Sequence, residues 1–152
     1  MKAVVQRVSR ARSTPGDEIG VGLCVLLGVA DGDTREDAER LAGKIARLRI
    51  FPDDEGRFDR SVLAANGRVL AVSQFTLIAD SKRQKGTRPD FHLAARPEVA
   101  EPIYNRFCEA LRELGVPVET GTFGARMSVD LVNDGPVTLV LDIDPPTSHP
   151  AA

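Results

Sequence analysis

The segment from Ile19 to Ala30 places the strongest constraint on the fold. Cys24 and Leu26 are apolar, although they point to the opposite face from the main apolar row. That row occupies every second position and consists of Val21, Leu23, Val25, Leu27 and Val29. A strand that is apolar on both faces is buried on both sides. We therefore expect a β-sheet with other elements packed over each of its faces.

Other segments have the apolar content and turn boundaries of strands. The expected strands cover Ala3–Val8, Val69–Ile78, Val116–Thr120, Met127–Val132 and Val137–Ile143. A turn-rich connection is expected over Arg12–Gly16, and turns are expected at Pro52–Gly56 and at Asn66-Gly67.

Two amphipathic helices are predicted between the strands. Asp33 opens the first as an N-cap candidate, with the acidic Glu36 three residues later, and the helical pattern runs through Arg49. The second covers Pro97–Leu114, and Gly115 suits its end. Helical crossovers early in the chain and hairpin-like spacing at its end predict an α+β domain with a mixed, curved, barrel-like sheet.

The stretch Val132–Thr138 is typical of a hairpin tip, because Asp134-Gly135 is a strong turn dipeptide between alternating strands. Pro136 fits this interpretation poorly. It removes a backbone donor where the second strand should begin to pair. It also creates an X-Pro bond, at which a cis peptide is inexpensive.

Length and composition favour one ordinary globular domain. The 152 residues are 42% hydrophobic and 28% charged, with a net charge of −2. This balance argues against binding to nucleic acid by bulk charge, but it allows a local basic patch. We expect one domain over residues 1–143 and a Pro-rich frayed tail over residues 144–152. No apolar run reaches 18 residues and the N-terminus lacks a signal peptide, so we expect a cytoplasmic protein without a membrane segment.

Cysteine and histidine usage argues against a disulfide and against a metal. Cys24 and Cys108 each lie in an apolar pattern, which favours buried free thiols. His92 and His149 are the only histidines, and neither Cys-x-x-Cys nor His-x-x-x-His spacing occurs. We therefore predict no metal site.

Polar residues at the end of the apolar strand Val69–Ile78 make it a candidate pocket wall. Gln74 is the most demanding of them, because a buried amide needs partners for its donors and its acceptor. Plain strand alternation is the alternative, with Gln74 and Thr76 on one face and Ser73 and Phe75 on the other.

A hydroxyl nucleophile in this strand lacks an evident base, since His92 is the only histidine placed to serve as one. Neither a Gly-x-Ser-x-Gly elbow nor a glycine-rich phosphate loop is present. Two neighbouring features suit RNA instead. The basic run Lys82–Arg88 is either a solvated loop or a phosphate contact. The segment Thr122–Met127 is either a core edge or an apolar platform for stacking a base.

Taken together, the chain resembles the D-aminoacyl-tRNA deacylase (D-tyrosyl-tRNA deacylase) family. The pentapeptide Ser73-Gln74-Phe75-Thr76-Leu77 and the dipeptide Gly135-Pro136 match its two signatures. The matching segments follow the family's order up to about Asp142. They are Ala3–Val8, Gly22–Val29, Arg49–Phe51, Val72–Leu77, Arg88–Phe91, Thr120–Met127 and Asn133–Thr138.

The resemblance implies hydrolysis of the ester between a D-amino acid and the terminal adenosine of tRNA, and removal of glycine mischarged on tRNA-Ala. It implies a homodimer without a metal or cofactor, with tRNA as its nucleic acid and neither DNA nor a membrane as a partner. In the family the Gly-Pro bond is cis, projects into the partner subunit's pocket and excludes L-amino acids by steric clash. Catalysis is assisted by the 2′-hydroxyl of the terminal adenosine.

Under this resemblance, we expect four groups of residues to have roles. Gly135 and Pro136 form the gate. Backbone N–H groups near Phe75 polarise the ester carbonyl. The residues that frame the ester are Ser73, Gln74, Phe75 and Thr76. Those expected to hold the adenine are Phe75, Phe123 and Met127, and those expected to contact acceptor-stem phosphates are Lys82, Arg83, Lys85 and Arg88.

Two departures from the family pattern stand out. The connection from Val8 to Ile19 is shorter than the family's first hairpin, which should carry a further Val-rich strand. The loop from Ser81 to Thr87 is longer and more basic. Two other functions stay open on the residues alone: a non-catalytic RNA- or nucleotide-binding module, and a structural dimer whose Gly-Pro turn completes an interface.

Overall fold

The computed structural model describes residues 1–143, so the predicted tail over residues 144–152 lies outside the described residues. The helices are α1 (Arg35–Arg47), α2 (Pro97–Glu113) and the short 3₁₀ helix η1 (Phe75–Ile78). The strands are β1 (Lys2–Thr14), β2 (Glu18–Ile19), β3 (Gly22–Gly28), β4 (Phe51–Pro52), β5 (Phe58–Arg60), β6 (Arg68–Ser73), β7 (Val118–Thr120) and β8 (Ser128–Asp142).

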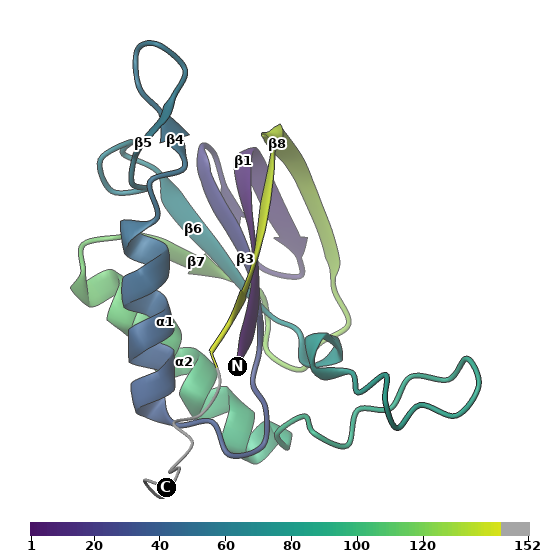
Figure 1. Ribbon diagram of the computed structural model, residues 1–152. Coiled ribbons are helices and arrows are strands. Elements are labelled where there is room, and N and C mark those ends of the chain that lie inside the picture. Colours follow the sequence, from purple (N-terminus) through teal and green to yellow (C-terminus); the bar gives the residue numbers. More distant parts are fainter. Residues whose placement is uncertain (144–152) are drawn as a thin grey trace, which may run out of the picture.

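The main sheet is mixed. Its hydrogen-bonded order is β2-β1-β3-β6-β7, and β8 pairs with β1. The β3–β6 and β6–β7 pairs are parallel, whereas β1 is antiparallel to each of its neighbours. Both long helices lie on one side of this sheet (Figure 1). The predicted α+β domain with a mixed, curved sheet and two long helices is confirmed.

Apolar residues fill both sides of the central strands, as the sequence of β3 predicts. The larger core lies between the sheet and the helices and includes Leu23, Leu41 and Phe107. On the opposite face, Cys24 and Leu70 pack into a second cluster with residues of β1 and β2. A sheet that encloses a second core in this way is curved, because its outer strands cover the far face of its central ones.

Helix α1 begins one residue later than the predicted N-cap. Thr34, not Asp33, is the N-cap, and its side chain accepts from the Asp37 N–H while the Asp37 carboxylate accepts from the Thr34 N–H. Asp33 has a different role: its buried carboxylate accepts from the Ala30 N–H at 2.7 Å and pairs with the Met1 ammonium at 2.9 Å. A carboxylate buried in this way needs such partners, which explains why it is not at the cap.

The predicted strand Val69–Ile78 is wrong in its second half. β6 ends at Ser73, and Phe75–Ile78 turns into η1. The expected alternation of side chains across residues 73–77 therefore does not exist. The Gln74 N–H still pairs with the Leu27 carbonyl, but the Leu77 N–H donates back to Gln74. The chain thus coils away from the sheet at this point.

The predicted hairpin at Val132–Thr138 is also wrong. Residues 128–142 form one long strand, β8, and both of its halves pair with β1. Asn133 lies opposite Val8 and Thr138 lies opposite Gln6, so the four residues between them bulge out of the ladder. Pro136 is tolerated there because a bulged residue needs no ladder donor. A turn dipeptide can therefore mark a bulge as well as a hairpin.

β1 is longer than predicted. It continues through the predicted turn region to Thr14, then Glu18–Ile19 pairs back on Ala11 and Arg12. The connection from Val8 to Ile19 therefore consists of the end of β1, a short turn and the two-residue strand β2.

One small element was not predicted as a strand pair. β4 and β5 form a two-stranded sheet, and with their turn they make a projection over residues 49–60, here called the finger (Figure 1). Its turn is closed by Asp53, whose carboxylate accepts from the Glu55 and Arg57 N–H groups at 2.9 Å each. The sequence shows this turn, but strands of two and three residues are too short for a periodicity argument.

Candidate active site

A cavity of about 500 Å³ opens at the end of β6, where η1 begins. Its wall combines this strand end with the start of α2 and with residues 123–129, which lead into β8. Most of the lining is apolar. The lining residues that matter for the argument are Ser73, Gln74, Phe75, Phe123 and Met127.

The polar part of the wall comes from the turn into η1. Gln74 Nε2 donates to Thr76 Oγ1 at 2.6 Å, so the two side chains hold each other. Gln74 makes no side-chain cap on η1. The backbone N–H groups of Phe75 and Thr76 lie in the first turn of this helix, where N–H groups have no partner within the helix. Such N–H groups can donate hydrogen bonds to an oxygen atom that carries negative charge.

The apolar part of the wall is held from behind by α2. The Phe123 ring packs on the buried Tyr104 ring, with centroids 5.8 Å apart. The Tyr104 hydroxyl donates to the Ala71 carbonyl of β6 at 2.7 Å, and burial raises its pKa. On the other side the Thr122 N–H lies 3.3 Å from Met127 Sδ. These contacts hold Phe123 and Met127, two of the three predicted adenine-binding residues, in place.

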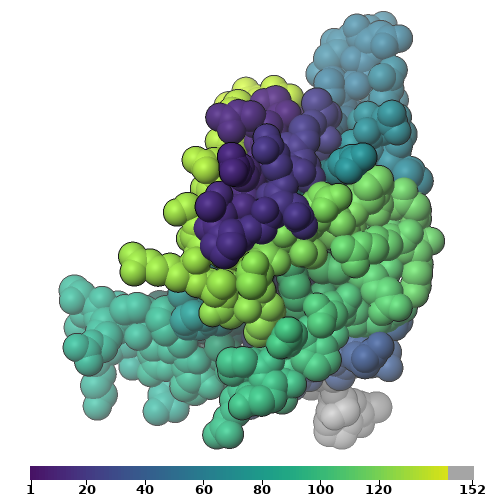
Figure 2. All heavy atoms as spheres, turned by 180° about the vertical axis from the view of Figure 1, so that it is seen from behind, coloured from purple at the N-terminus to yellow at the C-terminus, as the bar shows by residue number. Residues whose placement is uncertain are grey.

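A long loop borders this cavity. Residues 80–92, here called the basic loop, extend from the body between η1 and α2 (Figures 1 and 2). Its base is closed by the Asp80 N–H, which donates to the Asp90 carbonyl at 2.8 Å. His92 Nδ1 lies 2.7 Å from Asp90 Oδ1, and its Nε2 lies 3.8 Å from Asp80 Oδ2. The loop therefore has a structured base.

The cations of the basic loop have no ion-pair partner among residues 1–143. They are Lys82, Arg83, Lys85 and Arg88, and all four are exposed. Cations that are exposed and unpaired are available to phosphate groups.

Gly135 and Pro136 lie elsewhere on the chain. The bond between them is cis, both residues are exposed, and neither lines the 500 Å³ cavity. Asp134, which precedes Gly135, is held in place by Arg7, whose Nε donates to the Asp134 carbonyl at 3.1 Å. Arg7 Nη1 also donates to the Ile50 carbonyl at 2.7 Å, which ties the bulge of β8 to the finger.

Comparison with known proteins places the chain in a family. A family model described as D-Tyr-tRNA(Tyr) deacylase matches residues 4–142.

The chain belongs to the D-Tyr-tRNA(Tyr) deacylase family.

Similar proteins agree with this membership. A D-aminoacyl-tRNA deacylase of Symbiobacterium thermophilum is 58% identical over 146 residues, which cover 93% of this chain and 95% of that protein. One of Thermus aquaticus is 53% identical, with coverage of 93% and 95%. The resemblance inferred from the motifs is therefore confirmed.

Two solved structures share the fold. One, described as a c-Myc DNA Unwinding Element Binding Protein, is 45% identical with a TM-score of 0.86, and the match covers 95% of this chain and 99% of that one. The other, described as a probable eukaryotic D-amino acid tRNA deacylase, has a TM-score of 0.77 over 93% of this chain and 98% of its own. At 21% identity this second likeness supports the fold alone.

The structure gathers most, but not all, of the predicted deacylase site residues. Ser73, Gln74, Phe75, Phe123 and Met127 share one cavity, and Thr76 is bonded to Gln74 beside it. The four loop cations do not line that cavity; their loop touches it through Phe91, whose ring centroid lies 5.2 Å from that of Phe75. Gly135 and Pro136 are not brought to it within the chain. The assigned roles stay predictions.

Sequence reasoning missed three residues of this region: Arg7, Phe91 and Tyr104. Arg7 is nearly buried, which for an arginine signals dedicated partners. A charged residue at an inward position of β1 is the signal that could have found it. Tyr104 and Phe91 carry no comparable signal, since their contacts join elements far apart in the chain.

Three further predictions concern the cysteines, a metal site and a membrane segment. Cys24 and Cys108 are buried free thiols, as predicted, and burial raises the pKa of each to about 11. Within residues 1–143 no three His, Cys, Asp or Glu side chains are grouped as metal ligands, while His149 lies outside that range. None of the helices in the described part of the chain is long and apolar enough to cross a bilayer.

Proposed function

We propose that this protein hydrolyses the ester of D-aminoacyl-tRNA and releases the free amino acid and tRNA. One observation carries the proposal: in a chain of this family, Ser73, Gln74 and Phe75 share a cavity with Phe123 and Met127. Apolar and aromatic walls suit an adenine ring, and polar groups at the wall's end suit the ester.

In the proposed mechanism the backbone of η1 stabilises the developing charge. The N–H groups of Phe75 and Thr76 donate to the ester carbonyl oxygen as water adds to the carbon, and the bond to the ribose oxygen then breaks. The proton passes to that oxygen with help from the 2′-hydroxyl of the terminal adenosine. Such a route needs no protein base next to Ser73 or Thr76. It agrees with the hydrogen bond that already engages the Thr76 oxygen.

Chiral selection is proposed to act across a homodimer. Gly135 and Pro136 are exposed and lie away from their own chain's cavity, so a gate made of them must enter the cavity of a second copy. Exposed valines on β8, Val132 and Val140, provide apolar surface next to the bulge for such an association. The gate excludes an L side chain by clash and admits glycine, so glycyl-tRNA-Ala is a further proposed substrate.

The deciding experiment tests three substrates with the purified protein. They are D-tyrosyl-tRNA, L-tyrosyl-tRNA and glycine mischarged on tRNA-Ala. We expect hydrolysis of the D-tyrosyl and glycyl esters and survival of the L-tyrosyl ester. A protein that leaves D-tyrosyl-tRNA intact, while the relative from Thermus aquaticus cleaves it in parallel, is not a deacylase. Equal cleavage of both tyrosyl enantiomers refutes steric exclusion.

The route of proton transfer has its own test. A D-tyrosyl-tRNA that ends in 2′-deoxyadenosine should lose several orders of magnitude in rate, while Thr76→Ala should lose about tenfold or less, the effect of one hydrogen bond. The reverse pattern, with substrate binding intact, identifies Thr76 as a protein nucleophile.

We propose RNA, not DNA, as the nucleic-acid partner, although a solved relative is described as a DNA-element-binding protein. Deacylation should therefore be inhibited by uncharged tRNA at concentrations at which a DNA hairpin of the same length has no effect. Equal inhibition by both nucleic acids contradicts this preference.

A further inference from the structure

A second cavity, which is shallow and widely open to solvent, lies within the basic loop and has a volume of about 440 Å³. It adjoins the first cavity through an edge-to-face contact between Phe75, which lines the first, and Phe91, which lines the second. The residues that line the second cavity are Arg83, Lys85, Arg88, Pro89, Asp90 and Phe91. A ligand that extends beyond the first cavity on this side therefore enters the second.

The lining has the chemistry of a nucleotide site. Three cations without ion-pair partners in residues 1–143 are suited to a phosphate, and the ring of Phe91 is suited to a base. An aromatic side chain beside such cations is the combination used for single-stranded nucleic acid. A site for inorganic phosphate alone gives no role to the phenyl ring.

One carboxylate among these cations adds base selectivity. Asp90 Oδ1 accepts from the His92 N–H at 2.9 Å and from the His92 ring at 2.7 Å. Its Oδ2 makes no hydrogen bond within the part of the chain that the structure describes. Donation from the His92 N–H, above all, lowers the pKa of Asp90, so this oxygen is an acceptor only. It favours a base with an exocyclic amino group, such as cytosine, over uracil, which presents a carbonyl at the same position.

We propose that this cavity binds the penultimate nucleotide of the substrate RNA, a cytidine, and that Asp90 recognises its amino group. The inference rests on the proposed function, because it takes the terminal adenosine to occupy the first cavity. All tRNAs end in the sequence C-C-A, so a cytidine always precedes that adenosine. Arg83, Lys85 and Arg88 hold the phosphate, and Phe91 stacks on the base.

The part of the site formed by Asp90 and Phe91 is held in shape before the ligand arrives. His92 lies between the Asp80 and Asp90 carboxylates, and the Asp80 N–H closes the loop onto the Asp90 carbonyl. Phe91 is held by its contact with Phe75. A binding group positioned in this way loses less conformational entropy on binding than one on a free loop.

The test is equilibrium binding of three uncharged probes, CpA, UpA and adenosine, measured by calorimetry on the full chain. We expect CpA to bind at least tenfold more tightly than adenosine, and about tenfold more tightly than UpA. Phe91→Ala should weaken CpA roughly tenfold through loss of the stack. Asp90→Asn should bring CpA and UpA to within about threefold, because an amide can also donate to uracil.

A matched control comes from the finger, where Arg60→Ala removes an exposed arginine that is paired with Asp54. This variant should leave all three affinities as in the wild type. Circular dichroism checks folding of each variant, and Arg83→Gln replaces Phe91→Ala if the latter unfolds, with a loss of CpA affinity of severalfold.

The outcomes separate this inference from the proposed function. If CpA binds no better than adenosine, the second site is refuted even when D-tyrosyl-tRNA is hydrolysed. If UpA binds as well as CpA, recognition by Asp90 is refuted. If the CpA preference holds while D-tyrosyl-tRNA survives, the nucleotide site stands and the deacylase proposal fails.

Discussion

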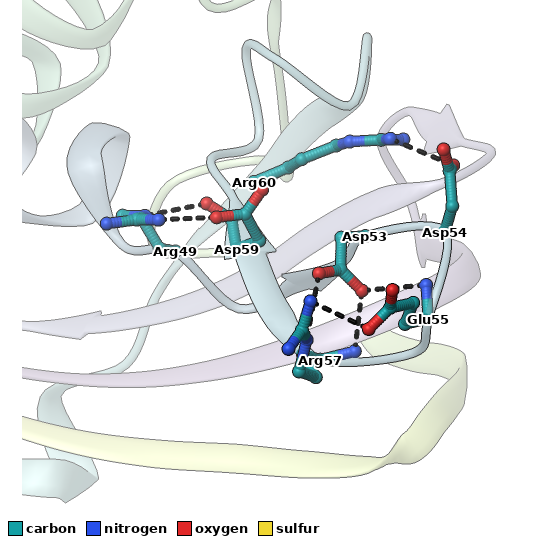
Figure 3. A network of polar contacts seen from close by, with 7 residues as sticks. All are labelled: Arg49, Asp53, Asp54, Glu55, Arg57, Asp59 and Arg60. Atoms are coloured by element: carbon teal, nitrogen blue, oxygen red, sulfur yellow. Dashed lines mark hydrogen bonds and ion pairs between the residues drawn. The ribbon is translucent and has the colours of Figure 1, made fainter.

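The finger and the basic loop are both exposed projections with several cations, yet the two use these cations in opposite ways. In the finger, Arg49 pairs with Asp59, Arg57 with Asp53 and Glu55, and Arg60 with Asp54 (Figure 3). In the basic loop, none of the four lysine and arginine side chains has an ion-pair partner within residues 1–143. The two lie at opposite ends of the molecule in Figure 1.

This difference indicates what each region does. Exposed ion pairs contribute little to stability, but they leave no net positive field for an anion. The finger instead positions the Arg7 side chain. Its Ile50 carbonyl accepts a hydrogen bond from Arg7, and its Phe58 ring lies 5.9 Å from the same guanidinium. The basic loop contributes charge that a phosphate can neutralise. One projection supports the bulge of β8, and we propose that the other binds a ligand.

The largest expected effect comes from removing the four unpaired cations of the basic loop. Replacement of Lys82, Arg83, Lys85 and Arg88 by glutamine should weaken tRNA binding by roughly 10²–10³-fold at about 0.15 M salt. The slope of log affinity against log salt should fall by about 3. Filter binding over a salt series measures both.

The matched control is the triple glutamine variant of Arg49, Arg57 and Arg60 in the finger. Because these cations are already neutralised by carboxylates, tRNA affinity and its salt slope should stay as in the wild type. An equal loss in both variants shows that net charge, and not the unpaired state, governs binding.

The next effect concerns the link between the finger and the gate segment. Arg7→Met should lower the free energy of unfolding by about 2–3 kcal/mol, because the buried Ile50 carbonyl loses a charged donor and the Asp134 carbonyl is released. Urea denaturation measures the loss. If the gate proposal holds, discrimination between D- and L-tyrosyl-tRNA should fall as well. A variant that is destabilised but fully selective shows that Arg7 supports the fold alone.

A smaller effect is expected at the gate itself. Gly135 has φ of +127°, and a Cβ at this position would lie 2.8 Å from Val137 Cγ2 and 3.0 Å from Arg7 Nη2. Gly135→Ala should cost about 1–2 kcal/mol of stability. The displaced segment should also admit L-tyrosyl-tRNA. Gly32→Ala is the control, since it changes a glycine of positive φ that has open space around its Cβ position and lines neither cavity. Unchanged chiral selectivity in Gly135→Ala argues against a gate at this bulge.

The smallest effect belongs to the finger's own ion pairs. Donation from the Arg57 N–H, above all, lowers the pKa of Asp53. The stabilisation from this carboxylate is therefore present above the ordinary Asp pKa, and it is lost as pH falls through the lowered value. NMR titration should place the Asp53 pKa below that of an unpaired aspartate, and Arg57→Gln should raise it only in part. An unshifted Asp53 contradicts the closed turn.

Much of the site could be predicted from the sequence because its parts lie in short contiguous motifs. Ser73, Gln74 and Phe75 are adjacent, Phe123 and Met127 are four residues apart, and the loop cations fall within seven residues. What joins these motifs could not be predicted. The Phe75–Phe91 and Tyr104–Phe123 contacts depend on how a loop and a helix pack beside the sheet. No local pattern specifies which distant ring a phenylalanine meets.

The sequence by itself determined the doubly buried strand, the two amphipathic helices and hence the mixed sheet, because apolar periodicity follows burial directly. Only the tertiary structure decided where β6 stops and whether Val132–Thr138 turns or bulges. Both depend on partners elsewhere: β1 offers a continuous edge to both halves of β8, so the chain crosses the Gly-Pro segment without reversing. Pairing over a long edge outweighs a local turn preference, which is worth far less than a ladder of backbone hydrogen bonds.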